Sequence, residues 1–167
     1  LERALSVQER EYGSEHVEVA AALSNLGTAF GDLGDYPKQK ELLERALSIQ
    51  EREYGPEHVE VAATLGNLGS AFGDLGDYQK QKELLERALS IKERAYGPEH
   101  VEVASPLHNL GNAFGQLGDY QKKKELLERA LSIKEREYGA EHVAVAVTLV
   151  SLGNAFGDLG DYQKAKE

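Results

Sequence analysis

Clusters of glycine and aspartate recur four times in this chain and could form sites for cations or phosphates. The stretch GDLGDYQK begins at Gly73 and at Gly157, with near copies at Gly31 and Gly115. Calcium takes about six to eight oxygen ligands, and the two aspartates of each cluster supply too few. We therefore interpret each cluster as a turn between two helices.

Within such a turn, glycine and aspartate have complementary roles. Gly76 is predicted to end one helix in a left-handed conformation, and Asp77 to cap the next helix with its carboxylate. Capping does not explain Gly73, which falls inside the first helix, where glycine costs about 0.5–1 kcal/mol relative to alanine. We interpret its bare backbone as a place open to close approach by a partner.

Histidines also recur at a fixed spacing, at His16, His58, His100 and His142. Equivalent residues of stacked helices lie about 8–10 Å apart, whereas zinc binds nitrogen ligands at about 2.0–2.1 Å. A shared metal is thus geometrically implausible, and these histidines are expected in turns. The one histidine out of phase, His108, has no paired acid or nucleophile, so it is weak evidence for catalysis.

No motif for a cofactor or for catalysis is present. The chain contains neither a dinucleotide-binding glycine motif, nor a phosphate-binding loop, nor a His-Glu-x-x-His pair. We predict no metal, no cofactor and no enzymatic activity.

Composition narrows the classes of partner. The net charge is −10, with 19 basic against 29 acidic residues, and this disfavours nucleic acid, which is bound through clustered Lys and Arg. No apolar run is long enough to cross a bilayer. With no cysteine, the chain weakly fits a reducing compartment. We expect a cytoplasmic protein that binds neither nucleic acid nor membrane.

An internal repeat is the dominant signal. LERALS begins at Leu1, Leu43, Leu85 and Leu127, a period of 42 residues. Each period contains two patterns of apolar residues in steps of three and four, which predict helices over about residues 58–75 and 78–96 in the second copy. One such pair of helices cannot bury its apolar surface alone, so the pairs must stack into a solenoid. A catalytic site needs one unique arrangement of side chains, whereas this chain repeats the same residue types evenly in every copy.

The segment over residues 61–78, followed by residues 84–89, resembles a tetratricopeptide (TPR) repeat. The ordinary repeat has 34 residues, and the longer form here resembles the repeats of kinesin light chains and of arrays attached to some signalling ATPases. The resemblance implies an all-α TPR helical-hairpin solenoid with a right-handed superhelix. Residues 1–167 would form a single array of about four repeats that starts and ends within second helices.

This resemblance implies a non-catalytic scaffold that binds an extended peptide in a concave groove lined by the first helices. In the family, an asparagine before a Leu-Gly pair commonly holds the backbone of the peptide; Asn25, Asn67 and Asn109 match it, and Ser151 replaces it in the fourth repeat. The alternative is that these asparagines only cap or crosslink helices. The other groove positions implied are Ser24, Thr28, Asp32, Ser70, Asp74, His108, Asn112, Gln116, Asn154 and Asp158.

Groove charge predicts the class of peptide. Family members that grip a terminal carboxylate use Lys or Arg on the first helices, and residues 17–33, 59–75, 101–117 and 143–159 contain neither. We therefore expect a neutral or basic segment as the partner, held near Asp32, Asp74 and Asp158.

Two features depart from the family pattern. At the helix crossing the family carries a small residue, as Ala165 does, but Gln39, Gln81 and Lys123 occupy the matching places. Three explanations are open: the hairpin opens slightly, these side chains snorkel outward, or the helices pack in a non-standard way, between chains.

Pro106 is expected to kink the third first helix, or to start a new helix capped by Ser105.

The alternative function is a regulatory, self-assembling sensor array of a larger multidomain protein, an ATPase being one candidate. Ends without polar capping repeats expose core surface, so head-to-tail association of copies is expected under this alternative.

Overall fold

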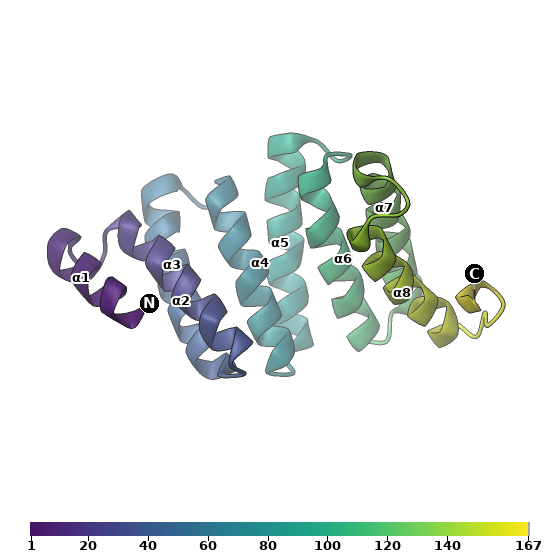
Figure 1. Ribbon diagram of the computed structural model, residues 1–167, viewed down its shortest axis with the longest axis horizontal. Helices are drawn as coiled ribbons and strands as arrows, with labels where there is room; N and C mark the ends of the chain where they lie inside the picture. The colour runs from purple at the N-terminus through teal and green to yellow at the C-terminus, as the bar shows by residue number, and fades with distance from the viewer. Residues whose placement is uncertain (167) are drawn as a thin grey trace. The chain divides into compact units, whose positions relative to one another are not determined.

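The computed structural model describes residues 1–166, and these residues form helices and no strand. The all-α prediction is confirmed. The second helix expected over residues 78–96 has those bounds, and the first helix is one residue shorter at each end than expected. The elements, in chain order (Figure 1), are α1 (Glu2–Tyr12), α2 (Val17–Asp32), α3 (Tyr36–Tyr54), α4 (Val59–Asp74), α5 (Tyr78–Tyr96), α6 (Val101–Gln116), α7 (Tyr120–Tyr138), α8 (Val143–Asp158) and a 3-10 helix, η1 (Lys164–Lys166).

The helices form successive antiparallel hairpins, as expected for a TPR solenoid. Helix α2 packs on α3 and α6 on α7; the second helix α3 also packs on α4, and α7 packs on α8. First helices also touch directly, α2 with α4 and α6 with α8. The chain divides into two compact units, Leu1–Ile91 and Lys92–Glu167, each described separately below.

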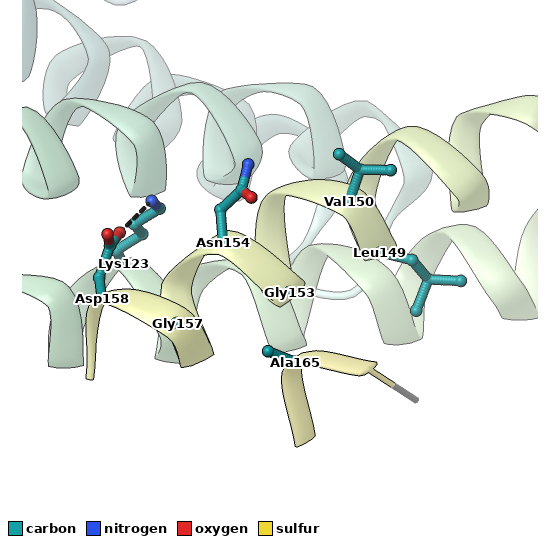
Figure 2. A pocket seen from close by; sticks show the side chains of 8 residues that line it. All are labelled: Lys123, Leu149, Val150, Gly153, Asn154, Gly157, Asp158 and Ala165. Atoms are coloured by element: carbon teal, nitrogen blue, oxygen red, sulfur yellow. Dashed lines mark hydrogen bonds and ion pairs between the residues drawn. The ribbon is translucent and has the colours of Figure 1, made fainter. Parts of the chain in front are cut away.

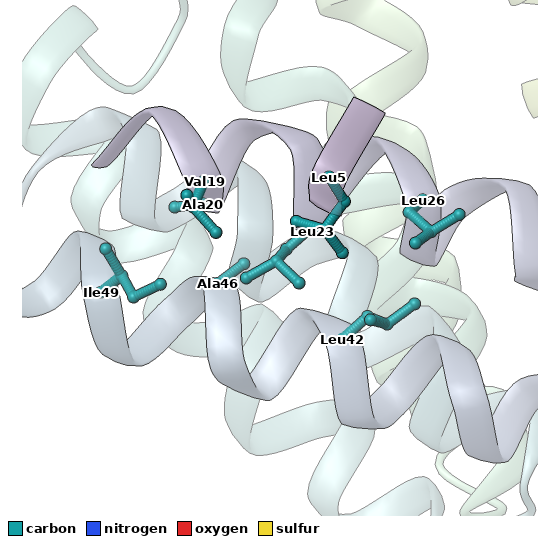
Figure 3. Close-up of a cluster of buried hydrophobic side chains, with 8 residues drawn as sticks. All are labelled: Leu5, Val19, Ala20, Leu23, Leu26, Leu42, Ala46 and Ile49. Carbon is teal, nitrogen blue, oxygen red and sulfur yellow. The ribbon is translucent and has the colours of Figure 1, made fainter. Parts of the chain in front are cut away.

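The first core cluster shows how the apolar pattern becomes packing. Figure 3 shows Leu5 of α1, Leu23 of α2 and Ala46 of α3 converging between the three helices. Leu23 and Ala46 are fully buried, and each buried leucine contributes about 1.5–3 kcal/mol relative to exposure. The same positions recur in α4 and α5, where Val61, Leu65 and Ala88 belong to the next cluster.

The glycine-aspartate turns are confirmed as helix boundaries. Gly76 has φ +83°, in the left-handed region, and Asp77 Oδ1 accepts a hydrogen bond from Lys80 N at 3.0 Å. The turn at Asp35 repeats this cap, with Lys38 N as donor at 3.1 Å. The aspartate oxygens bind backbone amides here, which supports a structural role for the clusters.

The periodic histidines are N-caps of the first helices. His58 Nδ1 accepts from Glu60 N at 3.3 Å, and its ring stacks on Tyr54 with centroids 4.8 Å apart. The same cap and stack occur at His16, His100 and His142. The prediction that these histidines serve the turns is confirmed.

An arginine from three of the four LERALS segments joins consecutive repeats. Arg87 donates to Pro56 O at 2.7 Å and pairs with Glu51 at 2.6 Å. Arg45 and Arg129 make the same pair of contacts to the preceding turn and helix. One planar guanidinium thus ties a second helix to the loop before it, which suits its fork of donors.

A second set of glycines accommodates the long side chains at the helix crossing. A Cβ added to Gly73 would lie 2.5 Å from Gln81 Nε2, and one added to Gly115 would lie 2.6 Å from Lys123 Cδ. The helices still approach closely at Gly69, where a Cβ would lie 3.1 Å from a leucine side chain of α5. The interpretation of Gly73 as a site open to a partner is therefore corrected, because Gln81 of the same hairpin occupies that space.

Of the explanations offered for Gln39, Gln81 and Lys123, outward snorkelling does not hold for Gln39. Gln39 is 7% exposed, so it does not snorkel outward. The side-chain oxygens of Gln39 and Gln81 have no hydrogen-bond partner among the described residues. Lys123 instead reaches the Asp158 carboxylate, at 2.8 Å.

Pro106 does not interrupt its helix. Helix α6 is continuous through this residue, which is buried, so the helix does not restart at Ser105. Its buried ring takes the position that Thr64 and Thr148 occupy in the neighbouring repeats.

Candidate functional site

Each first helix has one face that does not pack on the second helices. In α2, the exposed residues at steps of three and four are Glu18, Ala21, Asn25, Thr28 and Asp32. We call this row and its counterparts the first-helix stripe, formed in the other repeats by Glu60, Ala63, Asn67, Ser70 and Asp74; by Glu102, Ser105, Asn109, Asn112 and Gln116; and by Ala144, Val147, Ser151, Asn154 and Asp158. Ala144, Ser70, Asn109, Asn112 and Ser151 are half-buried, and the rest are exposed.

The three predicted asparagines lie on this stripe at equivalent positions. Asn25 and Asn67 are exposed in the first unit, and Asn109 is half-buried in the second. None of the three makes a side-chain hydrogen bond within the described chain. Their amides are therefore available to a ligand, and the structure gives no sign that they cap or crosslink helices.

Two hydroxyls of the predicted site are used inside their own helices. Thr28 Oγ1 donates to Ser24 O at 3.1 Å, and Ser70 Oγ to Gly66 O at 3.3 Å. Ser24 lies off the stripe, and its buried Oγ has no partner among the described residues. The hydroxyls of these side chains are therefore less available for hydrogen bonds to a partner than the amides of the asparagines.

In the first unit, the stripe carries acids and no base. Glu18 and Glu60 lie near the start of α2 and α4, and Asp32 and Asp74 at the end. Within the described residues none of these four carboxylates has an ion pair. Sequence reasoning identified the aspartates and missed both glutamates, although their spacing of seven residues from Asn25 and Asn67 would have placed them on the same face.

In the second unit, the acids of the stripe are paired with lysines from second helices. Lys92 Nζ lies 2.8 Å from Glu102 Oε2, and the pKa of this carboxyl is lowered by the hydrogen bond and charge of Lys92. Asp158 pairs with Lys123, as Figure 2 shows. Gln116 is neutral. The second unit therefore presents a less acidic stripe than the first.

His108 lies off the stripe, between α6 and α8. Its Nδ1 lies 3.3 Å from Thr148 Oγ1, and its Nε2 lies 3.4 Å from Ser151 Oγ. Burial and the nearby charge of Lys134 lower the pKa of His108 to about 4. The imidazole is therefore neutral near pH 7, and it joins two first helices instead of pointing freely toward a ligand.

A hollow of about 870 Å³ lies beside α8. Asn154 and Asp158 of the predicted site line it together with Leu149 and Val150 (Figure 2). Among the described residues, no atom lies within 4 Å of a Cβ added to Gly157, and the residue equivalent to Gln81 and Lys123 is here the small Ala165. The polar and apolar lining suits a peptide side chain better than a metal ion.

Two further classes of site are absent from the described part of the chain. Among residues 1–166, no three His, Cys, Asp or Glu side chains gather closely enough to hold a metal ion. Across the same residues, no helix combines the length and apolar character needed to span a bilayer.

Comparison with known proteins identifies the family. A family model described as tetratricopeptide repeat matches residues 33–91, 74–122 and 124–167. A second tetratricopeptide repeat model matches residues 103–144. The chain belongs to the tetratricopeptide repeat family. TPR repeats indicate a protein–protein interaction scaffold. No curated protein matches the chain significantly.

Solved structures are similar to most or nearly all of the chain. The nearly identical TPR-like repeats of a kinesin light chain-like protein from Podosopora anserina are 28% identical, with a TM-score of 0.81 over 99% of this chain and 78% of that one. BtubC (BKLC) from P. vanneervenii is 27% identical, with a TM-score of 0.81 over 89% of this chain, which spans 59% of BtubC. The Sgt2 TPR domain from Aspergillus fumigatus, 22% identical with a TM-score of 0.64 over 89% of this chain and 83% of that domain, shares the fold.

Proposed function

We propose that this TPR array binds an extended, neutral or basic segment of a partner protein along its first-helix stripes. The observation that carries the proposal is the stripe of the first unit, where exposed Asn25 and Asn67 lie among four unpaired carboxylates with no base. An amide side chain can both donate to and accept from a peptide backbone. The asparagines would hold the backbone, and the carboxylates would select basic side chains.

The charge of the stripe affects both the rate and the specificity of binding. Carboxylates at the rim of an interface steer a basic partner toward it and repel an acidic one. This effect weakens as salt screens the charges beyond about 10 Å at 0.1 M ionic strength. Affinity for a basic segment should therefore fall with rising salt.

A peptide array tests the proposal. The best binder and its charge-reversed twin would be measured against the unchanged protein, Asn67→Ala, and the double variant Glu60→Gln/Asp74→Asn. We expect a preference for the basic twin, and a loss of about tenfold in affinity from each stripe variant, equivalent to about 1.4 kcal/mol. The matched control is Glu11→Gln/Glu53→Gln, which makes the same change in net charge with exposed acids of α1 and α3. Equal binding of both twins at low salt, or equal losses in stripe and control variants, would reject the proposal.

Self-association is the second candidate, because α8 exposes an apolar surface. Val143, Val147 and Val150 are 70%, 53% and 66% exposed. Residues 21, 63 and 105, equivalent to Val147, are alanine or serine, so α8 is more apolar than the other stripes. Light scattering across a concentration series decides this alternative: growth in mass that Val147→Ser/Val150→Ser prevents, together with no peptide binder, would favour assembly.

A further inference from the structure

One position on each second helix has a counterpart ten residues later on the next first helix, and the charges at these two positions differ between repeats. The second-helix residues are Gln8, Gln50, Lys92 and Lys134, and the first-helix residues ten positions later are Glu18, Glu60, Glu102 and Ala144. Only the third pair combines a base with an acid, Lys92 with Glu102 at 2.8 Å. The fourth has the base without the acid.

Lys134 is a buried cation that has no counterion among the described residues. Its residue is 7% exposed, and within the described residues its Nζ has no carboxylate at ion-pair distance. Its Nζ donates a hydrogen bond to Thr148 Oγ1 at 2.8 Å, and that hydroxyl donates to Ala144 O at 3.0 Å. Removing a charge from water without pairing it is unfavourable, and burial accordingly lowers the pKa of Lys134.

The preceding repeat shows where a counterion fits. There, the carboxylate of Glu102 lies on the stripe in the first turn of α6, its side chain 48% exposed, and Lys92 reaches it with 17% of its own side chain exposed. In α8 the equivalent residue is Ala144, and the first turn contains no acid. The first-helix stripe beside Lys134 therefore lacks the carboxylate that the equivalent position provides in the other three repeats.

We propose that the Ala144 position of α8 is a binding point for a carboxylate of the partner, which pairs with Lys134 as Glu102 pairs with Lys92. A turn of the lysine from Thr148 toward the stripe would bring its Nζ to this carboxylate. Thr148 would keep its hydrogen bonds to Ala144 O and to the imidazole of His108. This proposal rests on the proposed function, because the carboxylate belongs to the bound partner. It adds that the part of the partner beside α8 carries an acidic group.

The array provides its own matched variants. Ala144→Glu places the missing acid within the chain, so it should occupy Lys134 and block the site. Glu102→Ala removes the acid from the preceding repeat, so it should create a second site at Lys92. Lys134→Met removes the charge and keeps an unbranched side chain of similar length.

The site is tested with small carboxylates, without any partner peptide. N-acetylglutamate α-amide carries a side-chain carboxylate, N-acetylglycine a terminal one, and N-acetylglutamine amide is the neutral control. Titration at low salt, followed by the amide NMR signals of Ala144 and Val145, should show saturable shifts with the carboxylates alone. Tighter binding of the first or of the second would indicate whether an acidic side chain or a chain terminus is preferred.

The expected loss in Ala144→Glu and in Lys134→Met is about tenfold in affinity, the range of a hydrogen bond between charged groups. In Glu102→Ala, new shifts should appear at residues 102 and 103. Absence of saturable shifts, or unchanged shifts in Ala144→Glu, would overturn the site. Because no peptide is used, this result is independent of the outcome at Asn67, so failure of the carboxylate site and failure of the stripe proposal can be told apart.

Discussion

At the scale of residues, the glycines at one position of the repeat do not all have the same surroundings. A Cβ added to Gly31, Gly73 or Gly115 would meet a long side chain of the second helix, whereas one added to Gly157 has no described atom within 4 Å. Lys123 is held in place at its far end by Asp158, so it cannot move aside from Gly115 without losing an ion pair. Position 115 is therefore the most constrained of the four.

We expect Gly115→Ala to lower the free energy of unfolding by about 1 kcal/mol, because overpacking of about 1–3 kcal/mol exceeds the gain from replacing a helical glycine. Gly157→Ala, with free space, should raise it by about 0.5–1 kcal/mol. Urea unfolding followed by circular dichroism measures both. In a Lys123→Ala background the Gly115→Ala penalty should disappear; a penalty that persists there would show that Lys123 is not its cause.

At the scale of elements, the first helices begin with an uncommon cap. Ser, Thr, Asp and Asn are the usual residues at this position, and here His58 Nδ1 accepts the amide hydrogen bond of α4. The acceptor must be an unprotonated nitrogen, so the cap requires the Nε2–H tautomer of the imidazole. The Tyr54 ring stacks on the imidazole and holds it in the orientation in which Nδ1 faces the helix amide.

His58→Ala should lower the free energy of unfolding by about 1 kcal/mol, the usual effect of removing a side-chain cap. His58→Asn should recover most of this loss, since asparagine also accepts from the helix amides. Equilibrium urea titration at neutral pH compares the three proteins. Equal destabilisation by alanine and asparagine would indicate that the stack on Tyr54, not the cap, is what His58 contributes.

At the scale of the whole molecule, a solenoid is stabilised by contacts between neighbours. Leu127 belongs to a core cluster with Leu152 and Ala155 in the second unit. Leu43 occupies the equivalent place in the first unit, among Val61 and Leu65. Both leucines are fully buried, so they form a matched pair for testing how far a local defect spreads.

Leu127→Ala should remove about 2–5 kcal/mol and increase amide hydrogen exchange mainly in α6, α7 and α8. Leu43→Ala should do the same mainly in α2, α3 and α4. Exchange measured by mass spectrometry on both variants locates the effect, because local opening follows local stability. A uniform rise over the whole chain in either variant would contradict nearest-neighbour behaviour.

The sequence alone determined the repeat, the two helices of each repeat, and the turns at Gly76 and Asp77. These features depend on residues close together along the chain: apolar steps of three and four, a left-handed glycine, and a capping carboxylate. The same short-range signals support the resemblance to TPR repeats. They also place Asn25, Asn67 and Asn109 on one face of their helices.

Only the tertiary structure decided which polar groups are free and which are already paired. Asp158 binds Lys123 from 35 residues away, and His108 binds Thr148 from 40 residues away, so neither is free for a ligand as the sequence suggested. Gln81 fills the space beside Gly73 because α4 and α5 pack closely within one hairpin. Periodicity predicts the face of a helix, but pairing depends on distances between helices, which the order of residues along one helix does not contain.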